Sequence, residues 1–117
     1  MTIKEFYAQI GEDDQDVVKR LGSEALIRRL IRKFPQDETF AALQEALEQQ
    51  NTETAFRAAH TLKGVAVNLG FTRLYHAAAA LTEVLRAAKL AEAAPLLAET
   101  ETAYRKIINA ISALTSD

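Results

Sequence analysis

Apolar residues recur along this chain at spacings of three and four, which is the signature of amphipathic helices, and no segment alternates as a strand would. Turn-forming residues interrupt the pattern at Gly11, Gly22, Pro35, Asn51, Gly70 and Pro95. The pattern predicts short helices over residues 2–10, 15–21 and 23–34, and longer ones over 37–50, 52–69, 72–89 and 91–114. Short turns between long helices make antiparallel neighbours. We therefore expect an all-α fold, an antiparallel up-and-down four-helix bundle with additional short N-terminal helices.

Residues suited to helix ends stand at these boundaries. Side-chain oxygens of Ser, Thr, Asp and Asn satisfy free N–H groups at helix starts, and such residues occur at Ser23, Asp37, Asn51 and Thr72. Gly70 suits the left-handed position after a helix. Pro95 is tolerated in a first turn, so the last helix should begin near Ala91.

The bulk composition narrows the classes of function. The 117 residues suit one domain, 1–117, and we expect a monomer. A net charge of -2 gives no basic excess for nucleic acid. The absence of cysteine removes disulfides and thiolate chemistry and is compatible with a reducing cytoplasm. Uncharged stretches are far shorter than the roughly 18 residues that span a bilayer, and no apolar leader follows Met1, so we expect a cytoplasmic protein without membrane contact.

The middle of the predicted helix 52–69 carries the candidate chemistry. His60, Lys63 and Gly64 lie at spacings of three and four, so they stack on one side of the helix. A glycine within a helix costs about 1 kcal/mol relative to alanine, and this chain uses alanine freely elsewhere. Gly64 therefore needs a reason other than helix stability.

The apolar stripe of this helix predicts where His60 points. Ala58, Leu62, Val65 and Leu69 share one face, and at 100° per residue His60 lies about 190° from its centre. We expect the imidazole to face water, with Gly64 leaving space above it. The candidate docking residues on the outward side are Phe56, Arg57, Val67 and Asn68. Burial under the N-terminal helices is an equally good explanation for the apolar side chain of Phe56.

An exposed imidazole beside a cation suits phosphoryl transfer. A neutral imidazole is a nucleophile that can carry a covalent group. A phosphoryl group on His60 could accept a charge-assisted hydrogen bond from Lys63, worth about 1.5 to 3 kcal/mol. The chain has no Gly-rich phosphate loop or nucleotide motif. We therefore expect a phosphocarrier that is no enzyme and has no kinase activity from ATP.

The run His60-Thr61-Leu62-Lys63-Gly64, followed by Asn68-Leu69-Gly70, resembles the signature of histidine-containing phosphotransfer (HPt) domains. The resemblance implies that His60 accepts a phosphoryl group from a receiver-domain aspartate and passes it to another receiver. It also implies that Lys63 holds the phosphoryl oxygens and that Gly64 gives access. The implied partners are receiver domains of a hybrid sensor histidine kinase and of a response regulator, with Mg²⁺ on the receiver and no cofactor of this chain's own. Val65 departs from the small residue usual in the family, and we expect it to alter packing only.

Two alternative functions are compatible with parts of this motif. An HPt-like module could dock a receiver or other partner without carrying phosphate, but the presence of both His60 and Lys63 favours the carrier. A metal site at His60 and Glu53 is opposed by the neighbouring cations, so we expect none.

The second histidine and three further basic residues lie outside the motif around His60. His76 has alanines around it and no cation beside it, so we expect an ordinary surface residue. A basic rim facing an acidic receiver pocket could include Arg73, Arg86 and Lys89.

Overall fold

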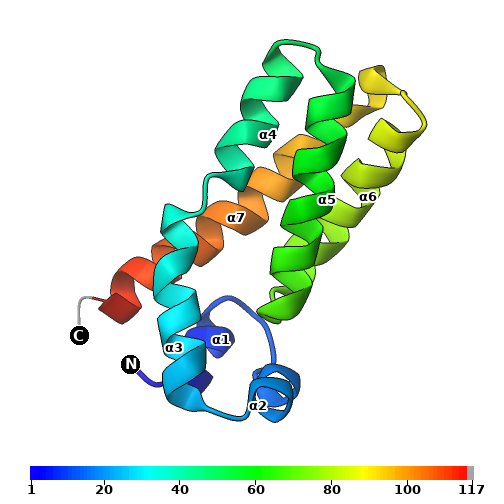
Figure 1. The fold of residues 1–117 in the computed structure, drawn as a ribbon. Coiled ribbons are helices and arrows are strands. Elements are labelled where there is room, and N and C mark those ends of the chain that lie inside the picture. Colours follow the sequence, from blue (N-terminus) through cyan, green and yellow to red (C-terminus); the bar gives the residue numbers. More distant parts are fainter. Residues whose placement is uncertain (116–117) are drawn as a thin grey trace.

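A computed structural model describes residues 1–115, and within this range all regular elements are helical, as predicted. The expected domain of 1–117 thus includes two residues, 116 and 117, that lie outside the described part. The α-helices in Figure 1 are α1 (Ile3–Gln9), α2 (Gln15–Leu21), α3 (Glu24–Lys33), α4 (Thr39–Glu48), α5 (Thr52–Asn68), α6 (Thr72–Arg86) and α7 (Ala93–Thr115). Two short 3₁₀ helices are η1 (Phe34–Gln36) and η2 (Leu90–Glu92).

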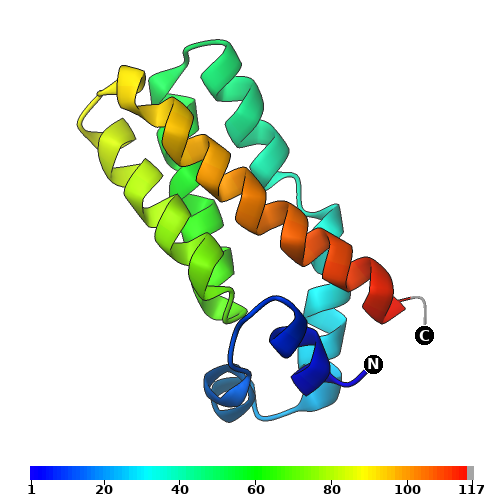
Figure 2. The same ribbon diagram turned by 180° about the vertical axis from the view of Figure 1, so that it is seen from behind.

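The last four α-helices form the predicted bundle. α5 packs between α4 and α6, and α6 packs in turn on α7. Figure 2 shows the molecule from behind, and there α7 runs along the bundle in front of the other bundle helices. The three N-terminal helices gather at one end, where α1 and α3 contact the C-terminal half of α7. The expected four-helix bundle with short helices packed on it is confirmed.

The core follows the apolar stripes of the sequence. On α5, Ala58 and Leu62 are buried and Val65 is half-buried, and Leu69, which caps the end of the helix, is buried as well, so the predicted inward face is confirmed. On α7 the pattern of fours and threes is buried at Ala93, Thr100, Ile107, Ile111 and Leu114 and half-buried at Leu97 and Tyr104. The outward side of α5 is thereby left to solvent.

Several predicted helix ends are confirmed by their hydrogen bonds. The Ser23 hydroxyl accepts from the Leu26 N–H at 3.2 Å, and the Asn51 side chain accepts from the Thr54 N–H, also at 3.2 Å. Gly70 takes the left-handed conformation with φ +73°. Pro95 is the third residue of α7, within its first turn.

Other predicted ends are wrong by a few residues. Thr72 does not cap α6: it is the first residue of the helix, and the cap position falls on Phe71, which is fully buried and provides no side-chain cap hydrogen bond. Asp37 accepts from the Thr39 N–H at 2.8 Å, yet the cap position of α4 falls on Glu38.

The helices α4 and α6 end before residues 50 and 89 because non-glycine residues turn the chain. Gln50 and Ala88 adopt positive φ values of 56° and 58°. The N–H of Lys89 then donates back to the carbonyl of Val84 at 2.9 Å, which closes the end of α6. Residues 90–92 form the 3₁₀ helix η2 rather than the start of α7.

Candidate functional site

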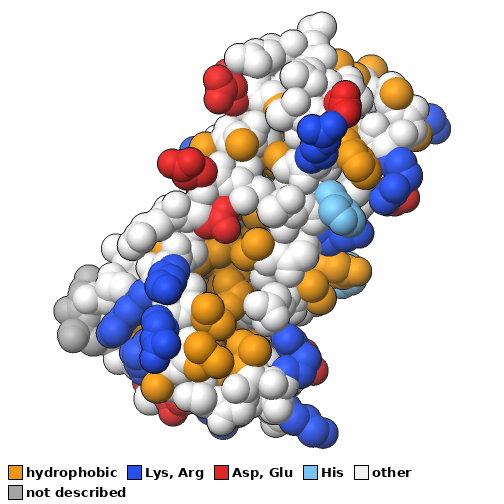
Figure 3. All heavy atoms as spheres, in the orientation of Figure 1, with side chains coloured by type: hydrophobic (Ala, Val, Ile, Leu, Met, Phe, Trp, Pro, Cys, Tyr) orange, Lys and Arg blue, Asp and Glu red, His pale blue; other side chains and the backbone are white. Residues whose placement is uncertain are grey.

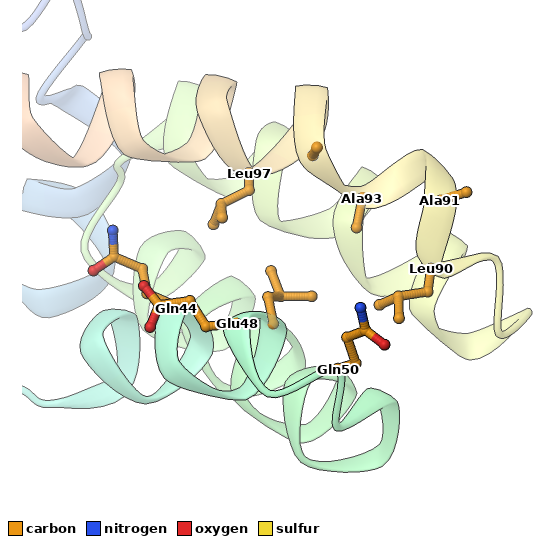
Figure 4. A pocket seen from close by; sticks show the side chains of 9 residues that line it. Gln44, Glu48, Gln50, Leu90, Ala91, Ala93 and Leu97 are labelled. Carbon is orange, nitrogen blue, oxygen red and sulfur yellow. The ribbon is translucent and has the colours of Figure 1, made fainter.

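A hollow in the surface lies between the end of α4 and the start of α7 (Figure 4). Its walls include the apolar side chains of Leu47, Leu90 and Leu97, with the amides of Gln44 and Gln50 at the rim. α5, which carries the candidate histidine, contributes no lining residue. The candidate chemistry therefore lies on a helix face rather than in this hollow.

His60 lies in the middle of α5 and is exposed, as the apolar stripe predicted. Figure 3 shows a histidine side chain on the face that α5 presents to the viewer. Within the described residues, the imidazole has no hydrogen bond or ion pair. One face of the molecule thus presents a histidine whose nitrogens are free to react.

Lys63 and Gly64 follow His60 by one turn. Lys63 is half-buried, and no described residue forms an ion pair or hydrogen bond with its ammonium group. A Cβ placed on Gly64 would meet nothing within 4 Å. Packing inside the protein therefore does not explain the glycine, and the space above the helix at this point is open.

The other charges near His60 are already paired. Arg57 forms an ion pair with Glu53 one turn earlier on α5, and both side chains are largely exposed. Arg86 on α6 lies 3.3 Å from Glu83, measured from Nε to Oε2. Such surface pairs contribute little to stability. Of these three cations, Lys63 is the one without an ion pair in the described part of the chain, so its ammonium is available to an incoming anion.

Phe56 is half-buried, although the N-terminal helices do not cover it. Figure 1 places those helices at the C-terminal end of α5, whereas Phe56 is the fifth residue of this helix. The ring of Phe56 instead stacks beside the His60 imidazole, with centroids 6.1 Å apart and planes 16° from parallel. The guanidinium of Arg86 lies 4.9 Å from the centroid of Phe56. The contact between Phe56 and Arg86 is not evident from the sequence, because the two residues lie on different helices.

The remaining docking candidates lie near the C-terminal end of α5. Val67 is 51% exposed and Asn68 is exposed. The carbonyls of both residues accept hydrogen bonds from the Arg20 guanidinium, at 3.2 and 3.1 Å. Their side chains remain free at the surface while their backbone is tied to α2.

The same end of α5 is also tied to α1, which the sequence did not indicate. The Tyr7 hydroxyl donates to the Leu69 carbonyl at 2.6 Å, and burial raises the pKa of this phenol despite the opposing effect of Arg20. A Cβ on Gly70 would come within 3.3 Å of the Cβ of Val17 on α2. The N-terminal helices thus hold the end of the histidine-bearing helix.

His76 is exposed on α6, next to the ring of Tyr75 at 5.3 Å between centroids. The expectation that no cation stands near it is wrong, because Arg73 and Lys106 line the same hollow between α6 and α7. The Arg73 guanidinium lies against Gly11, where a Cβ would come within 3.4 Å of it. The position four residues after His76 is Ala80 rather than a glycine.

Two further observations concern the described part of the chain. It contains no group of three or more His, Cys, Asp or Glu side chains arranged to hold a metal ion. None of its helices combines the length and the apolar character needed to cross a membrane.

The family model described as Hpt domain matches residues 35–115, which is more than half of the chain. The chain therefore belongs to the Hpt domain family, which acts in histidine phosphotransfer within phosphorelays and interacts with receiver domains. The matched residues include α4 to α7 and leave out α1 to α3. Comparison with curated proteins found no match, and comparison with solved structures found none either.

Proposed function

We propose that His60 is the phosphoacceptor of this Hpt domain. It takes a phosphoryl group from the aspartyl phosphate of a receiver domain in a hybrid sensor histidine kinase. It then gives the group to the receiver aspartate of a response regulator. The observation that carries the proposal is an exposed imidazole on α5, beside a lysine that pairs with none of residues 1–115 and an open glycine.

The bond-making and bond-breaking steps use one nucleophile from this chain. A ring nitrogen of His60 attacks the phosphorus, so that an N–P bond forms while the P–O bond to the receiver aspartate breaks. The aspartate leaves as a carboxylate with the bonding electron pair. The second transfer reverses these roles, since the new aspartate attacks and the imidazole leaves. Mg²⁺ belongs to the receiver in this scheme, and the chain acts as a phosphocarrier without kinase activity.

Lys63 supplies the counter-charge in the proposal. Phosphoryl transfer depends mainly on positioning and on positive charge near the transferred group. Lys63 lies one turn from His60 on α5, and no described residue forms an ion pair with its ammonium, so the ammonium can donate to a phosphoryl oxygen. Gly64 leaves room for the phosphoryl group and the receiver's active site.

The receiver docks on the outward side of α5 in this proposal. Arg57, Val67 and Asn68 are exposed on both sides of His60 along the helix. Val67 offers apolar contact area, and Arg57 offers a guanidinium at the rim. A partner seated over these residues would meet the imidazole near the centre of its footprint.

Labelling by a phosphorylated receiver domain tests the proposal. We expect the chain to acquire an acid-labile, base-stable phosphate, to lose this labelling in His60→Gln and to keep it in His76→Gln. Undiminished labelling of His60→Gln would overturn the assignment. Tight receiver binding with no labelling of the native chain would favour a docking module that carries no phosphate.

A further inference from the structure

The orientation of the His60 ring is limited by one neighbour. Among the described residues, the imidazole pairs with one other ring, that of Phe56, with centroids 6.1 Å apart and planes 16° from parallel. The two side chains are four residues apart on α5, so they lie one above the other on the same side of the helix. The nearly parallel planes mean that a rotation of the imidazole would break the stack.

Phe56 is itself held from the neighbouring helix. The Arg86 guanidinium lies 4.9 Å from the ring centroid, within the range of a cation–π contact. Arg86 is oriented in turn by Glu83, at 3.3 Å from Nε to Oε2. A chain of contacts therefore runs from Glu83 and Arg86 on α6, through Phe56, to the reacting side chain on α5.

The orientation of the His60 ring affects transfer because a ring nitrogen must point at the phosphorus atom in order to attack it. A histidine on a helix has about two common χ1 wells and two broad χ2 orientations, so an unrestrained ring divides its time among roughly four arrangements. Only an arrangement that aims a nitrogen at the phosphorus is productive. A stack that selects this arrangement raises the productive fraction about fourfold.

We infer that Phe56 and Arg86 are positioning residues for phosphoryl transfer, with Phe56 orienting the imidazole and Arg86 holding Phe56 in place. The inference rests on the proposed role of His60. It assigns Phe56 a different function from the exposed docking residues. Phe56 is half-buried beneath a side chain of α6, whereas Val67 is 51% exposed and open to a partner.

Single-turnover transfer from a phosphorylated receiver domain, measured over a range of receiver concentrations, tests the inference. We expect Phe56→Leu to lower the maximal rate about fourfold, by loss of the preferred arrangement, without changing the half-saturating concentration. Phe56→Tyr keeps the ring and should restore the native rate. Arg86→Ala should lower the rate about twofold, because the Phe56 ring remains but is no longer held.

The matched control for Arg86 is Arg105→Ala. Arg105 is also an exposed arginine paired with a glutamate on its own helix, but it lies on α7. We expect the native rate for this variant. A native maximal rate in Phe56→Leu would overturn the inference. A raised half-saturating concentration with an unchanged maximal rate would instead make Phe56 a docking residue.

Nuclear magnetic resonance of the imidazole tests the stack without any transfer. In the native chain the ring current of Phe56 should displace the carbon-bound proton signals of His60, and Phe56→Leu should remove the displacement while Phe56→Tyr keeps it. Signals that do not move in Phe56→Leu would overturn the stack itself. A native chain that no phosphorylated receiver labels would overturn the proposed function, so the two failures are distinguishable.

Discussion

Gly64 and Gly70 stand on the same helix or just beyond it, yet their surroundings differ completely. A Cβ on Gly64 would meet nothing within 4 Å, whereas one on Gly70 would come within 3.3 Å of the Val17 Cβ. Gly70 also has a φ of +73°, which a side chain would strain. The nearby carbonyls of Val67, Asn68 and Leu69 accept hydrogen bonds from Arg20 and Tyr7.

The contrast separates residues that serve the fold from residues that serve a partner. Backbone conformation and packing explain Gly70, but neither explains Gly64, whose cost to the helix is about 1 kcal/mol. Uncompensated violations of local stability are typical of functional positions. Substitutions in the middle of α5 should therefore change transfer, and substitutions at its C-terminal end should change the free energy of unfolding.

The largest effect should come from Gly64→Leu. A leucine one turn beyond His60 fills the space that the receiver's active site needs, and a displacement of about 1 Å in such reactions costs roughly a hundredfold in rate. We expect transfer from a phosphorylated receiver to fall at least about a hundredfold, with no loss of folding stability. The control is Ala80→Leu, at the same offset from His76. Native transfer by Gly64→Leu would show that the open space serves no partner.

The two glycines should respond oppositely to alanine. Gly70→Ala should destabilise the fold by about 1 to 2 kcal/mol, because the residue must keep a left-handed conformation. Gly64→Ala should stabilise it by about 0.5 to 1 kcal/mol, through better helix propensity. Chemical denaturation of both variants measures the difference, and equal changes in the free energy of unfolding would remove the contrast.

Lys63→Ala should shorten the lifetime of the phosphate on His60. A hydrogen bond to a charged group contributes about 1.5 to 3 kcal/mol, and the lower end of this range corresponds to about tenfold. We expect a lifetime about tenfold shorter, with an unchanged free energy of unfolding. Lys106→Ala, an exposed lysine on α7, provides the control. An unchanged lifetime in Lys63→Ala would mean that the ammonium does not contact the phosphate.

Tyr7→Phe should cost about 1 kcal/mol, because the Leu69 carbonyl loses a buried hydrogen bond. Burial raises the pKa of Tyr7 above its ordinary value of 10.0, so the folded state keeps the phenol proton after the unfolded state has lost it. Stability from this group is therefore fully present below about pH 10 and falls as the pH rises further.

Denaturation at increasing pH measures this effect. Tyr7→Phe should flatten the alkaline loss, leaving the part due to Tyr104, whose pKa burial also raises. We expect Tyr7→Phe to accept the phosphoryl group from a receiver domain at the native rate near pH 7. A lower transfer rate at unchanged stability would contradict the separation between the two regions of α5.

Much of this fold could be predicted because the buried face of each helix appears in the sequence as apolar residues at spacings of three and four. The inward placement of Leu62 and Leu69 determined the outward direction of His60, which the structure confirms. Ser23 and Asn51 cap helices through neighbouring N–H groups, so their roles also depend on nearby residues alone. The roles proposed for Lys63 and Gly64 follow from the same helical spacing and stay predictions.

What the sequence could not indicate depends on contacts between helices. Tyr7 and Leu69 are 62 positions apart, and Arg86 meets Phe56 only because α6 packs beside α5. The cap of α6 falls on Phe71 rather than on Thr72, and the ring of Phe71 packs against Phe6 and Phe34 from distant parts of the chain. Gln50 and Ala88 follow the ends of their helices with positive φ values, which the sequence does not indicate because neither residue is a glycine.

The central claim is that His60, and not His76, which is also exposed, carries the phosphoryl group. The most direct measurement is nuclear magnetic resonance of the native chain, labelled with nitrogen-15 and phosphorylated by a receiver domain, to find which ring nitrogen couples to phosphorus. The account predicts a coupling to a ring nitrogen of His60, with the signals of His76 unchanged. A coupling to His76 would contradict it.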